Sequence, residues 1–151
     1  MKKQKGFSLI ELLIVVAIIL IIAAIAIPNL IKSKMAANEA SAVGSLRTVN
    51  TAELTYSSTY GTGFTQLSVL GSSGLIDNVL GGGTKSGYTI KAAEVAGSGA
   101  GTSTNPFVQY TSSAKPINQG VTGTRYFCSD ESGVIRWETT DTCAATSTAL
   151  Q

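Results

Sequence analysis

The chain has 151 residues, enough for one domain and an anchor. Three of its eleven basic residues, Lys2, Lys3 and Lys5, come before Phe7, and the rest of the chain has eight basic and nine acidic side chains. This near-neutral balance gives no strong electrostatic indication of nucleic-acid binding. The absence of histidine from the sequence excludes Ser-His-Asp and Cys-His catalysis and any histidine-ligated metal site.

An apolar segment, residues 7–27, is long enough to cross a membrane. It has 21 positions, spans about 32 Å as a helix, and carries one charge, Glu11. Every residue from 12 to 27 is Leu, Ile, Val or Ala. The lysines before the segment predict a cytoplasmic N-terminus and an exported C-terminal body.

Two general interpretations account for most of this segment. A secretory signal would be cleaved near Ala24-Ile25-Ala26, which matches the A-x-A pattern, but the apolar run is longer than a usual h-region. A plain single-pass anchor fits the length. Neither interpretation explains Glu11. A carboxylate near the centre of a membrane helix costs roughly 2.5–3.5 kcal/mol, and a carboxylate near the end of the helix costs less but still needs a partner.

A third interpretation starts from the stretch KGFSLIELLIVVAIILIIAAIAIPNL, which resembles the class III signal of type IV pilins and type II secretion pseudopilins. The resemblance implies that a prepilin peptidase cuts between Gly6 and Phe7 on the cytoplasmic side and methylates the new N-terminus. Glu11 then matches the fifth mature residue of the family, and Pro28 matches the twenty-second.

Cleavage at this site suggests a partner for Glu11. It creates an α-amine at Phe7 that is largely cationic at neutral pH. A carboxylate and an ammonium group offset each other's desolvation when they pair, and Glu11 shares a helix face with Phe7 four residues earlier. In a filament the same amine would pair with Glu11 of a neighbouring subunit and fix the axial register. Monomethylation keeps the positive charge.

After the apolar segment, Pro28 is expected to kink or locally melt the helix. Helical periodicity then resumes and ends at Gly61, giving one helix from Phe7 to about Tyr60, about 80 Å long. Its second half has a core-facing stripe of Met35, Ala42, Leu46, Val49, Tyr56 and Tyr60. The opposite, solvent-facing side has Lys32, Lys34, Asn38, Ser41, Ser45 and Thr48.

The remaining residues, 61–151, are expected to form a small antiparallel sheet on the amphipathic half-helix, an α+β fold. The sequence predicts a short helix at Gly63–Leu70, a flexible loop at GGGTKSG and a second loop at 97–106. A hairpin turn is expected at 130–133. The strand candidates are Tyr88–Lys91, Phe107–Thr111, Arg125–Ser129 and Val134–Glu138.

Two cysteines, Cys128 and Cys143, lie near the C-terminus. They are too few for a thiolate zinc site and leave two alternatives, a disulfide in an oxidising compartment or two buried free thiols. A disulfide would stabilise the fold by about 3 kcal/mol. Their positions, on a predicted strand and in the tail, resemble the disulfide-bounded C-terminal region of many pilins.

Other candidate sites have ordinary explanations. The carboxylates of Asp77, Asp130, Glu131 and Asp141 fit no calcium-loop motif and are interpreted as solvated surface groups. The aromatic residues Tyr56, Tyr60, Phe64 and Trp137 are interpreted as packing residues rather than a stacking or electron-transfer path. No metal or cofactor is expected.

The sequence therefore predicts a structural subunit with no catalytic chemistry: a type IV pilin precursor that polymerises into a homo-oligomeric helical filament. Expected partners are the prepilin peptidase, the assembly platform with its ATPase, and the inner membrane before assembly into an extracellular pilus. The alternatives are a type II secretion pseudopilin and a membrane-anchored exported binding protein. The expected parts are a leader (1–6), a transmembrane and filament-core helix (7–30), an amphipathic half-helix (31–60) and a head with a C-terminal disulfide region (61–151).

Overall fold

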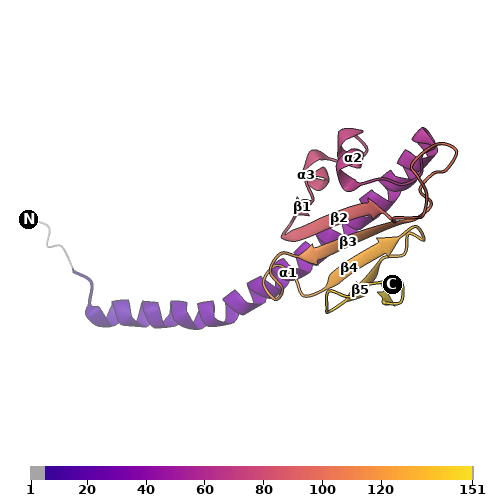
Figure 1. Cartoon of the computed structure of the whole chain (residues 1–151). Helices are drawn as coiled ribbons and strands as arrows, with labels where there is room; N and C mark the ends of the chain where they lie inside the picture. Colours follow the sequence, from indigo (N-terminus) through magenta and orange to yellow (C-terminus); the bar gives the residue numbers. More distant parts are fainter. Residues whose placement is uncertain (1–5, 151) are drawn as a thin grey trace, which may run out of the picture. The chain divides into compact units, whose positions relative to one another are not determined.

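The computed structural model describes residues 6–150 and has the expected α+β fold. Within these residues one long helix is followed by two short helices and six strands (Figure 1). Their bounds are α1 Leu9–Tyr60, α2 Leu67–Ser72, α3 Asn78–Gly81, β1 Thr84–Lys85, β2 Tyr88–Glu94, β3 Tyr110–Pro116, β4 Tyr126–Asp130, β5 Arg136–Glu138 and β6 Thr148–Ala149. The chain divides into two compact units at Lys34 and Met35, inside α1. We call residues 6–34 the stem and residues 35–150 the head.

The stem is helical from Leu9 onward, two residues later than expected. It contains a stretch that is long and apolar enough to cross a membrane, by length and composition. α1 continues through Pro28 without a break, so the helix does not melt at this proline, and the kink that was the other expected outcome stays a prediction. Proline holds φ close to the helical value and removes a single backbone hydrogen bond, and the helical residues on both sides keep the turn formed.

In the head, α1 buries one face against the sheet. Ala42, Leu46 and Val49 of the predicted stripe are buried, whereas Tyr60 at its end is 52% exposed. Ser45 was expected on the solvent-facing side, but it is buried. Its hydroxyl donates to the Ser41 carbonyl at 2.9 Å, and a hydroxyl satisfied by its own helix can enter a core at low cost.

The helix ends where the sequence predicts. Gly61 has φ of +69°, a left-handed conformation that glycine adopts without strain. Its amide donates to the Ser57 carbonyl at 3.0 Å and closes the last turn. The predicted helix stop at Gly61 is therefore confirmed.

The sheet is antiparallel, and each strand pairs with its neighbours in sequence, in the order β1-β2-β3-β4-β5-β6. The longest pairing, between β2 and β3, runs from Tyr88 opposite Pro116 to Glu94 opposite Tyr110. In the head, α1 passes behind the sheet (Figure 1), and the core lies between them. It contains Leu46 and Val49 from α1, Leu70 and Leu80 from α2 and α3, and Tyr88, Ile90, Ala114 and Phe127 from the strands.

The sequence located some strands better than others. β2 begins at Tyr88 as predicted, and β4 lies within one residue of its prediction. The prediction of a strand at Phe107–Thr111 is wrong in position, because β3 runs from Tyr110 to Pro116. Its inward positions include Ser112 and Ala114, so the apolar alternation that marks a half-buried strand is weak there. β5 is shorter than predicted, and β6 was not predicted.

The segment from residue 61 to 87 is more ordered than expected. The helix predicted at Gly63–Leu70 is shorter and begins later, as α2, and the second short helix, α3, was not predicted. GGGTKSG is not a flexible loop, because it contains β1 and a two-residue hairpin turn to β2. The turn residues, Ser86 and Gly87, have φ of +49° and +74°, as a type I′ turn requires.

The other two predicted connections are confirmed. Residues 97–106 contain no strand or helix among the elements described. The chain turns between β4 and β5 at 130–133, where the Asp130 carbonyl accepts from the Gly133 amide at 2.9 Å. The Asp130 side chain accepts from the Ser132 amide at 2.9 Å, an Asx turn that stabilises this reversal.

Candidate processing and assembly segment

The expected cleavage site lies in an open part of the stem. Gly6 and Phe7 precede the first turn of α1, and both are exposed, Phe7 at 87%. Among the described residues, no atom other than those of its chain neighbours lies within 4 Å of the position that a Cβ on Gly6 would occupy. The Gly6–Phe7 peptide bond therefore joins two exposed residues that precede the helix. The leader lysines Lys2, Lys3 and Lys5 lie outside the described residues.

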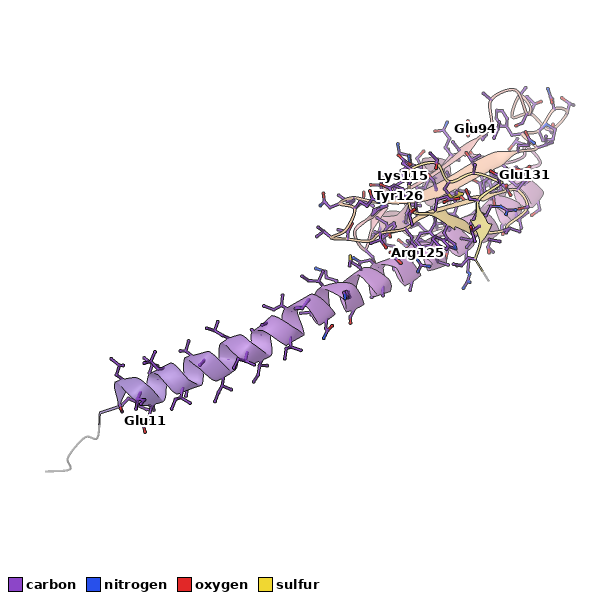
Figure 2. The ribbon with its side chains drawn as sticks, turned by 90° about the horizontal axis from the view of Figure 1, so that it is seen from below. Glu11, Glu94, Lys115, Arg125, Tyr126 and Glu131 are labelled. Carbon is purple, nitrogen blue, oxygen red and sulfur yellow. A yellow bond between two sulfur atoms is a disulfide. The ribbon has the colours of Figure 1, made fainter. Side chains whose placement is uncertain are left out.

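Glu11 has a partner that the sequence analysis missed. Its Oε2 accepts a hydrogen bond from the Ser8 amide at 2.9 Å, at the start of α1 (Figure 2). The Ser8 carbonyl accepts from the Leu12 amide at 3.3 Å, which begins the helix. Ser8 and Glu11 have the S-x-x-E spacing of a capping box, in which the third helical residue satisfies the amide of the N-cap. The signal was legible in the sequence as SLIE.

The apolar side chains of the stem have no packing partner within the stem. Side chains project from α1 on all sides (Figure 2). Between Phe7 and Ile31 every large hydrophobic side chain is between 44% and 87% exposed. An apolar surface all around a helix requires lipid or other protein to cover it. Pro28 lies within this surface.

In the head, a buried carboxylate joins α1 to the sheet. Glu39 is 6% exposed, and its Oε2 forms an ion pair with Arg125 Nε at 2.7 Å. Its Oε1 accepts from the Thr124 amide at 2.8 Å, the Thr124 hydroxyl at 3.0 Å and the Arg125 amide at 3.2 Å. Burial alone would raise the pKa of Glu39, but these hydrogen bonds outweigh it and lower the pKa. The Arg125 guanidinium also lies 5.4 Å from the Phe127 ring and 5.5 Å from the Trp137 ring.

A second buried polar cluster lies farther along α1. The side-chain amide of Asn50 donates to the Ser129 hydroxyl at 2.8 Å, and its carbonyl oxygen accepts from the Tyr110 hydroxyl at 3.0 Å. Asn50, Tyr110 and Ser129 are all buried. Because the polar atoms satisfy one another, the cluster fixes α1 against β3 and β4 without a desolvation penalty.

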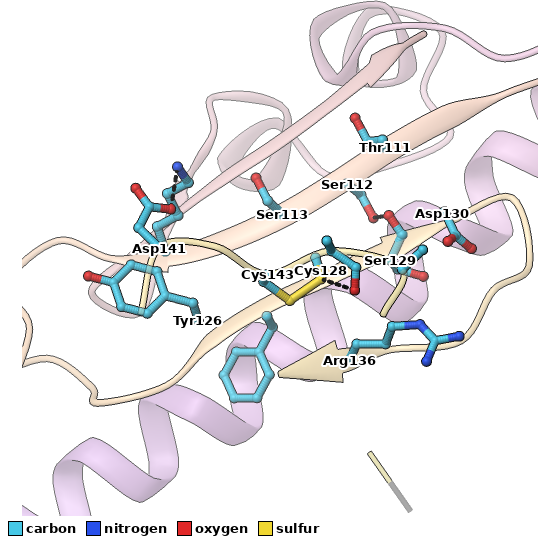
Figure 3. A pocket seen from close by; sticks show the side chains of 14 residues that line it. Thr111, Ser112, Ser113, Tyr126, Cys128, Ser129, Asp130, Arg136, Asp141 and Cys143 are labelled. Carbon is cyan, nitrogen blue, oxygen red and sulfur yellow. Dashed lines mark hydrogen bonds and ion pairs between the residues drawn. A yellow bond between two sulfur atoms is a disulfide. The ribbon is translucent and has the colours of Figure 1, made fainter. Parts of the chain in front are cut away.

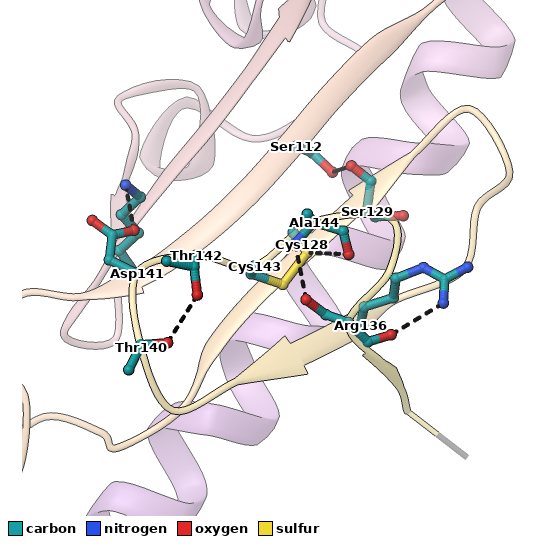
Figure 4. Close-up of a disulfide and its surroundings, with 11 residues drawn as sticks. Ser112, Cys128, Ser129, Arg136, Thr140, Asp141, Thr142, Cys143 and Ala144 are labelled. Atoms are coloured by element: carbon teal, nitrogen blue, oxygen red, sulfur yellow. Dashed lines mark hydrogen bonds and ion pairs between the residues drawn. A yellow bond between two sulfur atoms is a disulfide. The ribbon is translucent and has the colours of Figure 1, made fainter.

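The predicted disulfide between Cys128 and Cys143 is present, with the two Cα atoms 5.8 Å apart (Figure 4). It ties the tail after β5 to β4. Further bonds hold the tail: Arg136 donates to the Ser147 carbonyl at 3.2 Å, and Leu150 donates to the Ile135 carbonyl at 2.8 Å. A groove of about 430 Å³ lies beside the disulfide, between the tail and strands β3 and β4 (Figure 3).

The candidate carboxylates do not gather. Asp77 caps α3 by accepting from the Leu80 amide at 2.8 Å, Asp130 shapes the β4–β5 turn, and Asp141 pairs with Lys115 at 2.6 Å. Glu131 is exposed. Within residues 6–150 no three His, Cys, Asp or Glu side chains are placed to hold a metal ion.

The candidate aromatic residues are dispersed as well. Tyr56 lies 4.5 Å from Tyr60 and Phe64 lies 4.6 Å from Tyr110, measured between ring centroids. Trp137 packs against the core beneath Arg125. These residues serve as packing groups in the head.

The family described as the prokaryotic N-terminal methylation motif matches residues 1–27. The chain carries a class III prepilin signal. The signal holds Gly6, Phe7 and Glu11 and ends one residue before Pro28. The expected resemblance to type IV pilins is confirmed for this part of the chain.

Two pilins are similar to stretches of this chain. The type IV wide pilus major component PilA4 of Thermus thermophilus is 59% identical over 39 residues, which are 26% of this chain and 30% of that protein. The type IV major pilin protein PilA of Myxococcus xanthus is 48% identical over 54 residues, which are 36% of this chain and 24% of that protein. The chain thus matches less than a third of the length of either relative.

Proposed function

We propose that the chain is the precursor of a type IV pilus subunit, cleaved between Gly6 and Phe7, methylated at Phe7 and polymerised through its stem. One combination carries the proposal: a prepilin signal on a helix whose apolar side chains are exposed, followed by an α+β head. The parts are a leader (1–6), a membrane and filament-core helix (7–30), an amphipathic half-helix (31–60) and a head (61–151). The subunit itself performs no catalysis.

Before assembly, the apolar helix holds the subunit in the inner membrane with its N-terminus in the cytoplasm. The lysines of the leader support this orientation. The Cys128–Cys143 disulfide supports an exported head, because disulfides persist in oxidising compartments. The prepilin peptidase then has access to Gly6–Phe7 from the cytoplasmic side, and the assembly platform and ATPase draw the subunit into the extracellular filament.

Assembly needs a driving force other than hydrophobic transfer, because lipid tails are as apolar as the stem. Helix packing supplies one part. Glu11 supplies another: it caps α1 in the precursor, and after cleavage it pairs with the Phe7 amine of a neighbouring subunit. Pro28 has a role in assembly as well, as the point of the stem where the helices of neighbouring subunits pack closely or adjust their packing.

The Glu11→Gln variant separates the two roles of this residue. Glutamine at the third helical position still accepts the Ser8 amide and keeps the cap, but it lacks the charge that pairs with an amine. We expect normal cleavage and at least about a tenfold loss of filament mass, because an unpaired buried ammonium costs several kcal/mol. Shear fractionation followed by electron microscopy measures the filaments.

The Ser8→Ala variant is the matched control, since its backbone amide still donates to Glu11, and it should assemble normally. Abundant filaments from Glu11→Gln would contradict the register role of the charge.

The second candidate is a type II secretion pseudopilin, because the N-terminal signal, where the family match lies, resembles that of both groups. The disulfide favours the pilin. Long fibres on the cell surface at natural expression would support the pilin, whereas secretion defects without surface fibres on deletion would support the pseudopilin. An anchored binding protein would give neither.

A further inference from the structure

Two carboxyl groups in the head each have one oxygen without a hydrogen-bond partner. Glu53 on α1 is fully buried, at 0% exposure, and Glu94 ends β2 (Figure 2). Oε2 of Glu53 accepts from the Thr65 amide at 2.9 Å, and Oε1 of Glu94 accepts from the Gln66 side-chain amide at 3.2 Å. The other oxygens, Glu53 Oε1 and Glu94 Oε2, are buried and have no partner among the described residues.

The donors packed around Glu53 are already committed. The Tyr110 hydroxyl on β3, whose pKa is raised by burial and then by the charge of Glu53, donates to Asn50 at 3.0 Å. The Thr65 amide and the Gln66 side chain serve the other oxygen of each carboxyl group. These donors therefore leave Glu53 Oε1 and Glu94 Oε2 without a hydrogen bond.

No cation compensates the pair within residues 6–150. The three ion pairs there join Asp77 to Lys85, Asp141 to Lys115 and Glu39 to Arg125. The titratable groups that act on this region are all acids or phenols: Tyr110 on β3, and Asp130 and Glu131 in the turn beyond it, which act on Tyr110.

Two adjacent desolvated carboxylates are unfavourable without a counter-ion. Burial, and after it the charge of Glu94, raises the pKa of Glu53 to about 7, against a smaller opposing effect of the Thr65 hydrogen bond. The raised pKa of Glu53 agrees with its buried, unpartnered oxygen, because both indicate that this carboxyl group holds a proton.

We propose that Glu53 is a proton-binding site, which holds a proton on its buried carboxyl group, near Glu94, while the head is folded. The proton comes from water when the head folds, and it returns to water when the site opens. In the closed site Glu53 is the neutral acid.

The site controls one segment, residues 61–66, which connects α1 to α2. Thr65 and Gln66 bind the two carboxyl groups, and Thr62 and Phe64 form backbone hydrogen bonds of 3.1 Å with Phe107. When the proton leaves, a charged carboxylate is buried beneath this segment at Glu53, near the acidic side chain of Glu94. Opening the segment to water solvates this charge, so opening becomes more favourable as pH rises through neutrality.

Hydrogen exchange of the Thr65 amide in the full chain, purified in detergent micelles, tests the site. Its protection factor, corrected for intrinsic exchange, should fall by about tenfold or more between about pH 5.5 and about pH 8. The Leu80 amide is the internal control, because it also donates to a carboxylate, Asp77, whose pKa is lowered and which stays ionised over this range. Its protection factor should not change.

The Glu53→Gln variant should keep Thr65 protected and lose the pH dependence, since a neutral amide replaces the acid and its oxygen can still accept from the Thr65 amide. Should that variant fail to fold, Glu94→Gln provides the second test: it removes the repulsion, and the loss of Thr65 protection with pH should shrink. A wild-type Thr65 protection factor that is constant with pH overturns the proposal. So does recovery of protection at about pH 8 in millimolar calcium, which would make the pair a divalent-cation site instead.

Discussion

Glu39 is a single residue that links α1 to the chain just before β4. It receives four hydrogen bonds from Thr124 and Arg125, residues that lie more than eighty positions away in sequence. Because these bonds hold the pKa of Glu39 below its ordinary value of 4.5, the stability it contributes is present at neutral pH. It is lost as pH falls below about 4.5, when the unfolded chain binds a proton more readily.

The Glu39→Gln variant should lower the free energy of unfolding of the head by about 2–3 kcal/mol at neutral pH. Breaking a buried pair typically costs more, about 3–5 kcal/mol, but Arg125 is partly exposed and can turn to water. Thermal or denaturant unfolding of the full chain in detergent measures the change. Glu131→Gln, which removes an exposed carboxylate, should change it by less than about 0.5 kcal/mol. Equal stability of the two variants would contradict the role of Glu39.

The candidate residues differ in how far sequence reasoning could reach them. Gly6, Phe7 and Glu11 were accessible because they belong to a local motif, and the Ser8–Glu11 cap was equally local although it was missed. The buried state of Glu39 and Glu53 was not accessible, because glutamate on a helix is usually solvated. Their partners come from remote segments that only the folded chain brings together.

At the scale of elements, the disulfide governs the C-terminal tail. The tail after β5 contributes only the short strand β6 to the sheet, so few backbone bonds hold it apart from the covalent link. The double variant Cys128→Ser, Cys143→Ser should lower the free energy of unfolding by about 3 kcal/mol, because the unfolded chain regains the entropy of a loop closed over 15 positions. Denaturant unfolding of the full chain measures it.

Wild-type protein treated with a reductant provides the control for this variant, since it should lose the same stability without any substitution. A reduced wild type as stable as the oxidised protein would show that the tail is held by its hydrogen bonds alone.

Elements with strong local signals were predicted well. The helix end at Gly61 and the turn at Asp130 depend on residues whose backbone preferences act alone. The position of β3 was predicted wrongly because its buried positions include Ser112 and Ala114. The burial of these residues depends on the Asn50 cluster and on α1. GGGTKSG was predicted to be flexible because it is rich in glycine, whereas the pairing of Lys85 with Tyr88 uses the positive φ of Ser86 and Gly87 for a tight turn.

At the scale of the whole molecule, the head has a hydrophobic core of its own, whereas the apolar side chains of the stem are exposed. The head has a buried apolar core and has paired most of its buried polar groups, although it also exposes single apolar side chains such as Leu54 and Val79. The stem exposes its apolar surface over the entire stretch from Phe7 to Ile31. This division supports the proposal that subunits assemble through the stem.

Mass spectrometry of the mature N-terminus is the most direct test of this account. Protein purified from sheared surface fractions of the native cell should begin with N-methyl-Phe7, with residues 1–6 absent and Glu11 four positions into the chain. A mature protein that retains Met1, or one that begins after Ile27, would contradict the proposed processing and, with it, the pairing on which assembly depends.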